Sequence, residues 1–321
     1  MSSTWRCSRG SRPGRRADRH DVGTFRKCLC GHNIDVAIYG DSDVGTGQLF
    51  CGVELARRIE KAESDLIVAA TRAAGDRGAD GLVLPVAGGF ACFAEAESPM
   101  NKLVGLGFDG VPDEAVLGEI ERAFAARGSE TRVELSNLAD PELTALLSGR
   151  GYRLAEFENV LGRPIGVEAP LATEVDVRRA ADLTAWVNVV VEGFAHPDGE
   201  GAVSHEQFPA DIIERAERDI EKAGATPYIA LYGGAVAGGA MMRLADGIAQ
   251  LAGAATAPAF RRRGVQAALL ASRLAEAADA GCEIAVVTTA PGSKSQHNVQ
   301  RRGFQLLYTR AILVKPVAAV Q

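Results

Sequence analysis

The chain has 321 residues, which is enough for one or two globular domains with hydrophobic cores of their own. Apolar residues make up 47% of it and charged residues 24%, and no segment approaches the roughly 18 consecutive apolar residues of a membrane span. The net charge is −6, yet residues 1–33 hold eight basic and two acidic residues, so the remainder carries −12. These numbers exclude a membrane-spanning protein, and an acidic body argues against general nucleic-acid binding.

The first 48 residues are expected to form a basic, disordered leader. Residues 1–33 show neither an apolar period nor the apolar core of a secretory signal. The six cysteines have no spacing typical of a disulfide framework, so we expect a protein of the reducing cytoplasm. Cys28, Cys30 and His32 lack the fourth ligand and the partner cluster that structural zinc requires, and we expect no metal.

From residue 49 the hydrophobic pattern predicts alternating helices and strands. Two helices are expected at 49–62 and 65–74, divided at Ser64, a favourable N-cap. Strands, helices and turn residues then alternate up to a proline-containing linker at 166–174. The predicted strands are 81–87, 90–95, 102–108, 132–138 and 152–160, and the predicted helices are 113–126 and 141–147.

The second half shows a similar order. Helices are expected at 180–191 and 210–223, separated by a polar loop at 193–209. Glycine turns then separate three strands, and a basic turn leads into a helix that ends near residue 280. The strands of this half are predicted at 228–231, 234–244, 248–255 and 283–289, with final strands up to residue 314.

An internal repeat supports a division into two copies. Residues 150–164 align without gaps on residues 302–316, at a constant offset of 152 positions. Both segments begin with Arg-Gly-aromatic and end at proline. We therefore predict an α/β (α+β) protein with two tandem domains at 49–165 and 175–321, each a mixed, mostly antiparallel sheet flanked by helices.

Residues 251–280 carry the clearest chemical signal. An apolar strand of small residues leads into Pro258, three arginines and Gly264, and a helix with an apolar stripe follows. The backbone N–H groups of residues 263–267 would be unpaired donors at the start of this helix, where the helix dipole favours negative charge. Because glycine admits a close backbone approach, the pattern predicts a phosphate-binding turn.

This series of elements, followed by Asn298 and by Arg302-Gly303-Phe304, resembles the acetyl-CoA-binding half of the GNAT N-acetyltransferases. The family's turn is (R/Q)-x-x-G-x-(G/A). Arg261 and Gly264 match it, whereas Gln266 stands where a small residue is expected. Residues 107–113 read Gly-Phe-Asp-Gly-Val-Pro-Asp at the corresponding place in the first half, and their carboxylates would repel a pyrophosphate. The resemblance thus implies two tandem GNAT-like domains with a degenerate N-terminal copy and a single cofactor site.

The resemblance also implies which residues bind acetyl-CoA. In the family, the strand before the turn diverges from its neighbour and the thioester lies in the gap, where backbone groups pair with the pantetheine arm and polarise the thioester carbonyl. The cofactor-binding residues implied here are Ala254, Ala255, Thr256, Arg261, Arg262, Arg263, Gly264, Val265, Gln266, Ala267 and Asn298.

Acyl transfer to an amine requires one proton to leave the ammonium and one to reach the departing thiolate. Tyr308 is the nearest candidate for the acid, since arginines occupy the family's usual tyrosine place. The strand at 248–255 contains no carboxylate, so a water relay or a group elsewhere must serve as the base. The candidates for the base and the acceptor site are Glu200, His205 and Glu206 in the polar loop, together with Asp246 and Glu283.

The expected function is an N-acetyltransferase that moves an acetyl group from acetyl-CoA to a primary amine of a small molecule or peptide by direct attack. We expect a monomer or homodimer with no nucleic-acid or membrane partner. One alternative is a non-catalytic acyl-CoA-binding or regulatory module, and another is a structural protein whose basic leader docks on acidic surfaces.

Overall fold

The computed structural model describes residues 49–166, 171–196 and 208–317, all of which belong to one compact unit, Gln48–Gln321. The predictions for the leader at 1–48 and for the loop residues Glu200, His205 and Glu206 lie outside the described residues. Within the described ranges, no helix combines the length and the apolar character that crossing a membrane requires.

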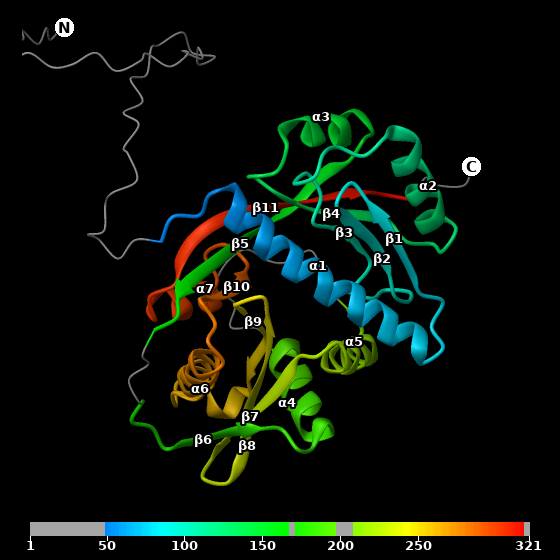
Figure 1. Cartoon of the computed structure of the whole chain (residues 1–321). Helices are drawn as coiled ribbons and strands as arrows, with labels where there is room; N and C mark the ends of the chain where they lie inside the picture. The colour runs from blue at the N-terminus through cyan, green and yellow to red at the C-terminus, as the bar shows by residue number, and fades with distance from the viewer. Residues whose placement is uncertain (1–48, 167–170, 197–207, 318–321) are drawn as a thin grey trace, which may run out of the picture. The chain divides into compact units, whose positions relative to one another are not determined.

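A mixed β-sheet runs through the described residues. In space its strands follow the order β1-β2-β3-β4-β11-β5-β10-β9-β8-β7-β6 (Figure 1). The neighbouring pairs β3–β4 and β9–β10 are parallel and the other pairs are antiparallel. The strands are β1 (Leu82–Val86), β2 (Gly89–Phe93), β3 (Lys102–Val104), β4 (Thr131–Ser136), β5 (Arg153–Pro164), β6 (Val175–Arg179), β7 (Thr226–Tyr232), β8 (Ala235–Ala245), β9 (Ile248–Thr256), β10 (Ile284–Thr289) and β11 (Gln305–Lys315).

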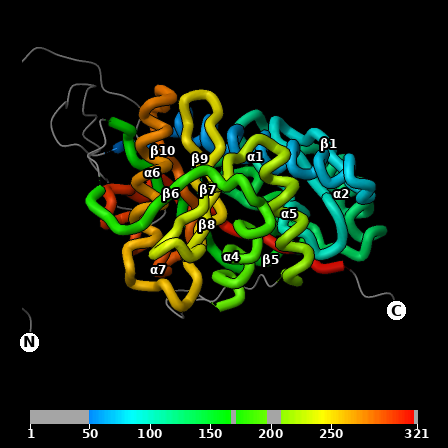
Figure 2. Tube along the Cα trace, turned by 90° about the horizontal axis from the view of Figure 1, so that it is seen from below, coloured from blue at the N-terminus to red at the C-terminus, as the bar shows by residue number. Residues whose placement is uncertain are grey.

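Helices cover both faces of this sheet. They are α1 (Val53–Asp76), α2 (Glu114–Ala125), α3 (Pro141–Gly149), α4 (Leu183–Ala195), α5 (Ala210–Lys222), α6 (Val265–Asp279) and α7 (Lys294–Gln300), with a 3-10 turn, η1, at Pro258–Phe260. Successive residues of a strand face opposite sides of the sheet. In β9, Ile248 packs with α1 and Ala252 with α4 on one side, whereas Ala249 packs with α6 on the other. Helices α4 and α6 therefore lie on opposite sides of β7–β9 (Figure 2).

The two halves share an order of elements. The series α1-β1-β2-β3-α2-β4-α3-β5 is matched by α5-β7-β8-β9-α6-β10-α7-β11, and β6 and α4 precede the second series. The aligned repeat segments form β5 and β11, which pair with each other and place Arg310 opposite Glu158, its equivalent at the offset of 152. The two copies of the repeat are thus related by a local two-fold axis.

The last strands of the two halves are exchanged. Strand β5 lies between β11 and β10, and β11 lies between β4 and β5. Each final strand therefore pairs with the fourth strand of the other half's series, β5 with β10 and β11 with β4. The sheet therefore runs without a break across the predicted boundary at 166–174. The division into two copies stays a prediction, and the shared sheet was not anticipated.

The predicted interruption of the first helix at Ser64 is wrong. Helix α1 is continuous through this position, where the Ser64 hydroxyl donates to the Glu60 carbonyl at 2.7 Å. Gly105, with φ of +72°, packs so closely on Ser64 that an added Cβ would lie 2.3 Å from its hydroxyl oxygen. The serine is thus a helix-interior packing residue, because its hydroxyl is satisfied by the preceding turn.

A cluster of buried charged groups lies near the two-fold axis. Arg310 is 1% exposed, and its Nε donates to Glu60 Oε1 at 2.7 Å. Its Nη1 lies 3.7 Å from Glu134 Oε2 and 3.8 Å from Glu158 Oε2. Burial and the neighbouring Glu134 carboxylate raise the pKa of Glu158 to about 7. Although burial opposes it, the cations Lys102 and Arg310 lower the pKa of Glu134. Arg310 thus contacts three carboxylates at the centre of the sheet, one of which, Glu134, is also paired with Lys102.

Candidate active site

The predicted succession of strand, glycine turn and helix is present, and phosphate binding at this turn stays a prediction. Strand β9 ends at Thr256, η1 follows, and Gly264 is the N-cap of α6 with φ of +79° and no side-chain cap. A Cβ added at Gly264 would meet no atom within 4 Å, so the left-handed backbone is what favours glycine there. The first N–H groups of α6 have no partner within the helix, and the turn can therefore present them to an anion.

The three arginines of the turn have different surroundings. The guanidinium of Arg261 donates to the carbonyl of His196, directly after α4. The guanidinium of Arg263 lies over the ring of Tyr232, with Cζ 5.2 Å from the ring centroid. Arg262 is exposed and has φ of +62°. All three add positive charge at the N-terminal end of α6, where the helix dipole acts in the same direction.

Strands β9 and β10 diverge beside this turn. They pair in parallel from Ile248–Ile284 to Leu251–Val287, and the pairing ends there although β9 continues to Thr256. Gly253 has φ of +56° at a register shift against β8, which marks a β-bulge. Residues 254–256 are half-buried, and β10 does not pair with them. This arrangement leaves backbone groups of β9 available to a ligand next to the turn.

The structure brings Asn298 and Gln266 together. The amide nitrogen of Asn298, on α7, donates to Gln266 Oε1 in the first turn of α6. The glutamine that stands where the family has a small residue is therefore held by α7. Asn298 thus reaches the start of α6, and its predicted contact with the cofactor stays a prediction.

The candidate proton-transfer groups are dispersed. Tyr308 is 3% exposed and its hydroxyl donates to Glu60 Oε1 at 2.8 Å, and its role as an acid stays a prediction. Asp246 and Glu283 precede β9 and β10, and Arg58 donates to the backbone carbonyl of Asp246 and to the carboxylate of Glu283. Both acids thus lie at the N-terminal ends of their strands, whereas the turn follows the C-terminal end of β9. The structure therefore does not bring Asp246 and Glu283 to the turn.

Glu217, on α5, was not predicted as a site residue from the sequence. This residue is 8% exposed, and its Oε2 lies 3.4 Å from the position that a Cβ on Gly253 would take. The available signal was its place among the apolar residues Ile212, Ala216 and Ile220 of an amphipathic helix. A carboxylate on such a face is unusual unless it is paired or functional.

The corresponding turn of the first half is filled by its own residues. Asp109 forms an ion pair with Arg57, and its Cβ lies 2.5 Å from the position of a Cβ on Gly88. The Gly107 carbonyl accepts from the N–H of Asp140 at 2.8 Å. An anion would meet a carboxylate here rather than free donors.

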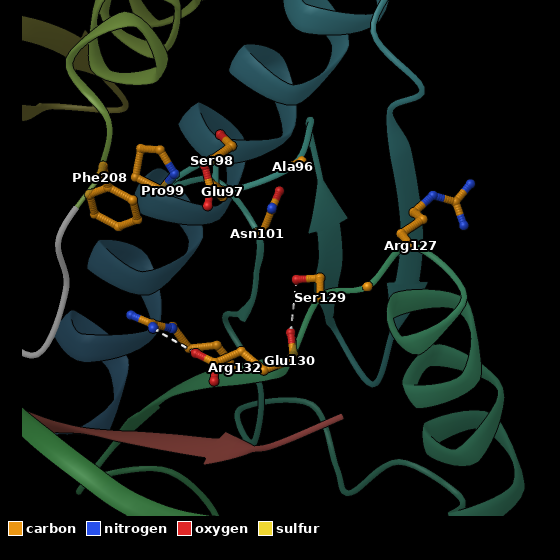
Figure 3. A pocket seen from close by; sticks show the side chains of 11 residues that line it. Ala96, Glu97, Ser98, Pro99, Asn101, Arg127, Ser129, Glu130, Arg132 and Phe208 are labelled. Carbon is orange, nitrogen blue, oxygen red and sulfur yellow. Dashed lines mark hydrogen bonds and ion pairs between the residues drawn. The ribbon is translucent and has the colours of Figure 1, made fainter. Parts of the chain in front are cut away.

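A cavity of about 260 Å³ lies elsewhere, between the β2–β3 and α2–β4 loops (Figure 3). Asn101, on its wall, accepts from the Ala94 N–H at 2.8 Å and donates to the Glu95 carbonyl at 2.7 Å. Arg132 donates to Glu130 at 2.9 Å. These side chains hold the loops in place, and we assign no chemistry to the cavity.

Residues 192–304 match the model of the acetyltransferase (GNAT) family, and this interval contains β9, the turn and α6. The chain contains a GNAT domain. Comparison with curated proteins finds no match. Among solved structures, the chain is similar to a GCN5-related N-acetyltransferase from Kribbella flavida at 20% identity, with a TM-score of 0.58 over 83% of this chain and 97% of that one.

A second similar structure is a tandem GNAT protein from the clavulanic acid biosynthesis pathway, solved without AcCoA. It is 11% identical to this chain, with a TM-score of 0.51 over 75% of this chain and 80% of that one. At these identities the likeness shows the fold alone. The predicted fold class, a mixed α/β protein of the GNAT type, is confirmed.

Proposed function

We propose that the protein is an N-acetyltransferase that moves an acetyl group from acetyl-CoA to a primary amine of a small molecule or peptide. The observation that carries this proposal is the uncapped N-terminus of α6 after Gly264, next to the place where β9 and β10 separate. N–H groups that can donate hydrogen bonds to a pyrophosphate thus lie next to a strand edge that can pair with an amide-containing arm. Acetyl-CoA contains both of these parts.

The donors fit a pyrophosphate. The free N–H groups at residues 265–267 lie next to the cationic side chains of Arg262 and Arg263, while no carboxylate occurs within residues 251–267. Charge-assisted hydrogen bonds contribute about 1.5–3 kcal/mol each. Several of them would give roughly micromolar affinity once the costs of association are subtracted.

The unpaired part of β9 would hold the rest of the donor substrate. When bound, acetyl-CoA supplies an activated acetyl group. Backbone groups of Ala254, Ala255 and Thr256 would orient the pantetheine arm, and an N–H group among them would polarise the carbonyl of the thioester. The first half would be a degenerate copy without an anion site, and its helix α1, on the same face as α4 and α5, would support the acceptor side.

Release of free thiol from acetyl-CoA tests this function. We expect the full chain to release CoA only when a suitable acceptor is present, in a panel that contains spermidine, lysine, an aminoglycoside and a peptide with a free N-terminus. The acetylated amine is then identified by mass. Binding of acetyl-CoA without thiol release across the panel would instead favour a non-catalytic acyl-CoA-binding module.

A further inference from the structure

Helix α5 carries a largely buried carboxylate, Glu217, that has no partner among the described residues. Within the described residues, Glu217 forms no ion pair and accepts no hydrogen bond, although only 8% of the residue is exposed. The other buried acids of the described chain have partners: Glu60 and Glu134 contact Arg310, and Asp219 contacts Arg77. An unpaired buried carboxylate is costly, so its retention calls for a chemical reason.

The carboxylate faces the β-bulge of β9. Its two oxygens lie 3.4 and 3.7 Å from the position that a Cβ on Gly253 would occupy, and the Trp186 ring lies 3.8 Å from the same point. Gly253 immediately precedes residues 254–256, to which we assign the acyl donor. Glu217 thus lies next to the expected position of the reacting thioester.

Glu217 and the phosphate-binding turn approach β9 from different faces. The side chains of Leu251 and Ala254 pack in the core that contains α6. Those of Ala252 and Ala255 pack in the core that contains α4, the face on which Glu217 lies. A donor substrate held by α6 and an acceptor that enters from the α4–α5 side would therefore meet at the free edge of β9.

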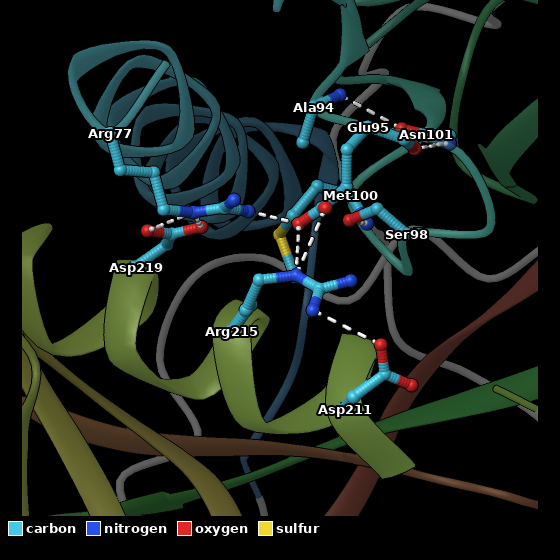
Figure 4. Close-up of polar contacts among 9 residues, drawn as sticks. All are labelled: Arg77, Ala94, Glu95, Ser98, Met100, Asn101, Asp211, Arg215 and Asp219. Carbon is cyan, nitrogen blue, oxygen red and sulfur yellow. Dashed lines mark hydrogen bonds and ion pairs between the residues drawn. The ribbon is translucent and has the colours of Figure 1, made fainter. Parts of the chain in front are cut away.

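An ion-pair network fixes the position of α5 (Figure 4). Arg215 and Asp219 flank Glu217 on the helix and contact other elements. Arg215 Nε lies 3.0 Å from Glu95 Oε2, just after β2, and Asp219 Oδ2 lies 3.0 Å from Nε of Arg77, at the end of α1. These contacts anchor α5 to the first half of the chain, so Glu217 is held towards β9.

The electrostatic surroundings suit a base that works near neutral pH. Burial alone raises the pKa of Glu217 to about 7. Helix α4 and strand β9 present Trp186 and Gly253 to it, neither of which titrates. On α5, Arg215 pairs with Glu95 and Asp211, Asp219 with Arg77, and Arg218 with Glu214. Glu221 and Lys222, one turn further along α5, form no ion pair within the described residues.

We propose that Glu217 is the base that removes a proton from the acceptor ammonium. This inference rests on the proposed acetyl transfer. The ammonium gives one proton to the carboxylate, and the freed lone pair of the nitrogen forms the C–N bond while the C–S bond breaks. A second proton leaves the nitrogen for the departing sulfur, so CoA leaves as the thiol, and Glu217 returns its proton to solvent. The acceptor is then a primary amine that is protonated in solution and binds as a cation.

The test compares two nucleophiles in the full-length wild type and in E217Q. One is the best alkyl amine of the panel, which is protonated at pH 7, and the other is hydroxylamine, which is already uncharged. E217Q should lower kcat/KM for the alkyl amine by about 10²- to 10⁴-fold, the usual contribution of a general base, and should affect hydroxylamine less than about tenfold. The rise of kcat/KM with pH through about 7 should disappear in E217Q.

Two variants and two readouts other than turnover separate catalysis from structure. E217D should keep part of the rate, and E214Q, which changes a carboxylate paired with Arg218 on the same helix, should act as wild type. The Kd for acetyl-CoA should not change in E217Q. The infrared difference between wild type and E217Q should show one carboxyl group that titrates near pH 7.

The outcomes are distinguishable. Equal slowing of both nucleophiles in E217Q, or an unchanged rate with the alkyl amine, would overturn the role of Glu217 and leave acetyl transfer standing. Absence of thiol release by the wild type with every amine would overturn acetyl transfer itself, and the assignment of Glu217 with it.

Discussion

Replacing Gly264 with tryptophan is expected to weaken acetyl-CoA binding by about 10²- to 10⁴-fold while the chain stays folded. The left-handed backbone at Gly264 costs a residue with a side chain about 1–2 kcal/mol, and relaxing that strain would turn the N–H donors of α6 away. Losing two charge-assisted hydrogen bonds of about 1.5–3 kcal/mol each accounts for the expected range of Kd. Isothermal titration with acetyl-CoA measures the change directly.

The chain offers a matched control for this variant. Gly110, in the corresponding turn of the first half, has φ of +94° and, like Gly264, would meet no atom within 4 Å if it gained a Cβ. Gly110→Trp therefore introduces the same ring at a similarly strained and open position. Its Kd for acetyl-CoA should equal that of the wild type. Equal weakening by both variants would point to a general loss of structure and remove the support for a site at Gly264.

The second large effect is expected on stability, at Arg310. Arg310→Met should lower the free energy of unfolding by about 3–5 kcal/mol, because it leaves the carboxylates of Glu60, Glu134 and Glu158 buried without their shared cation. This is a large part of the roughly 5–15 kcal/mol that stabilises a typical domain. Urea unfolding followed by circular dichroism gives the difference.

Two further variants show whether charge is the cause. Arg153→Met, at an exposed position on the neighbouring strand β5, should change the free energy of unfolding by less than about 0.5 kcal/mol. Adding Glu60→Gln to Arg310→Met should recover part of the loss, since it removes one uncompensated carboxylate. A loss below about 1 kcal/mol for Arg310→Met would mean that the buried cluster does not depend on this arginine.

The parts of the structure that depend on neighbours in sequence could be predicted. The turn at Gly264 follows from a strand, a glycine and a helix in direct succession, and the divergence of β9 from β10 followed from the resemblance that this succession carries. Ser64 shows the limit of such local patterns. A serine satisfies its hydroxyl equally well as an N-cap or by bonding the preceding turn, and the packing of Gly105 on Ser64 is not visible locally.

Features that join distant segments could not be predicted. The repeat at an offset of 152 indicated two equivalent strands, but a strand pattern does not say which half each strand will join. Glu217 was missed for a similar reason. Its helix is rich in charged residues, and only the packing of α5 against β9 places this carboxylate next to Gly253.

Hydrogen–deuterium exchange of the full chain with and without acetyl-CoA tests the central claim most directly, because it locates the binding site residue by residue. We predict slower exchange of the amides at 265–267 and 254–256 when acetyl-CoA is present, and no change at 107–113 in the first half. Unchanged exchange at 265–267 under saturating acetyl-CoA, or protection at 107–113 instead, would contradict the assignment of the acyl-CoA site to the N-terminus of α6.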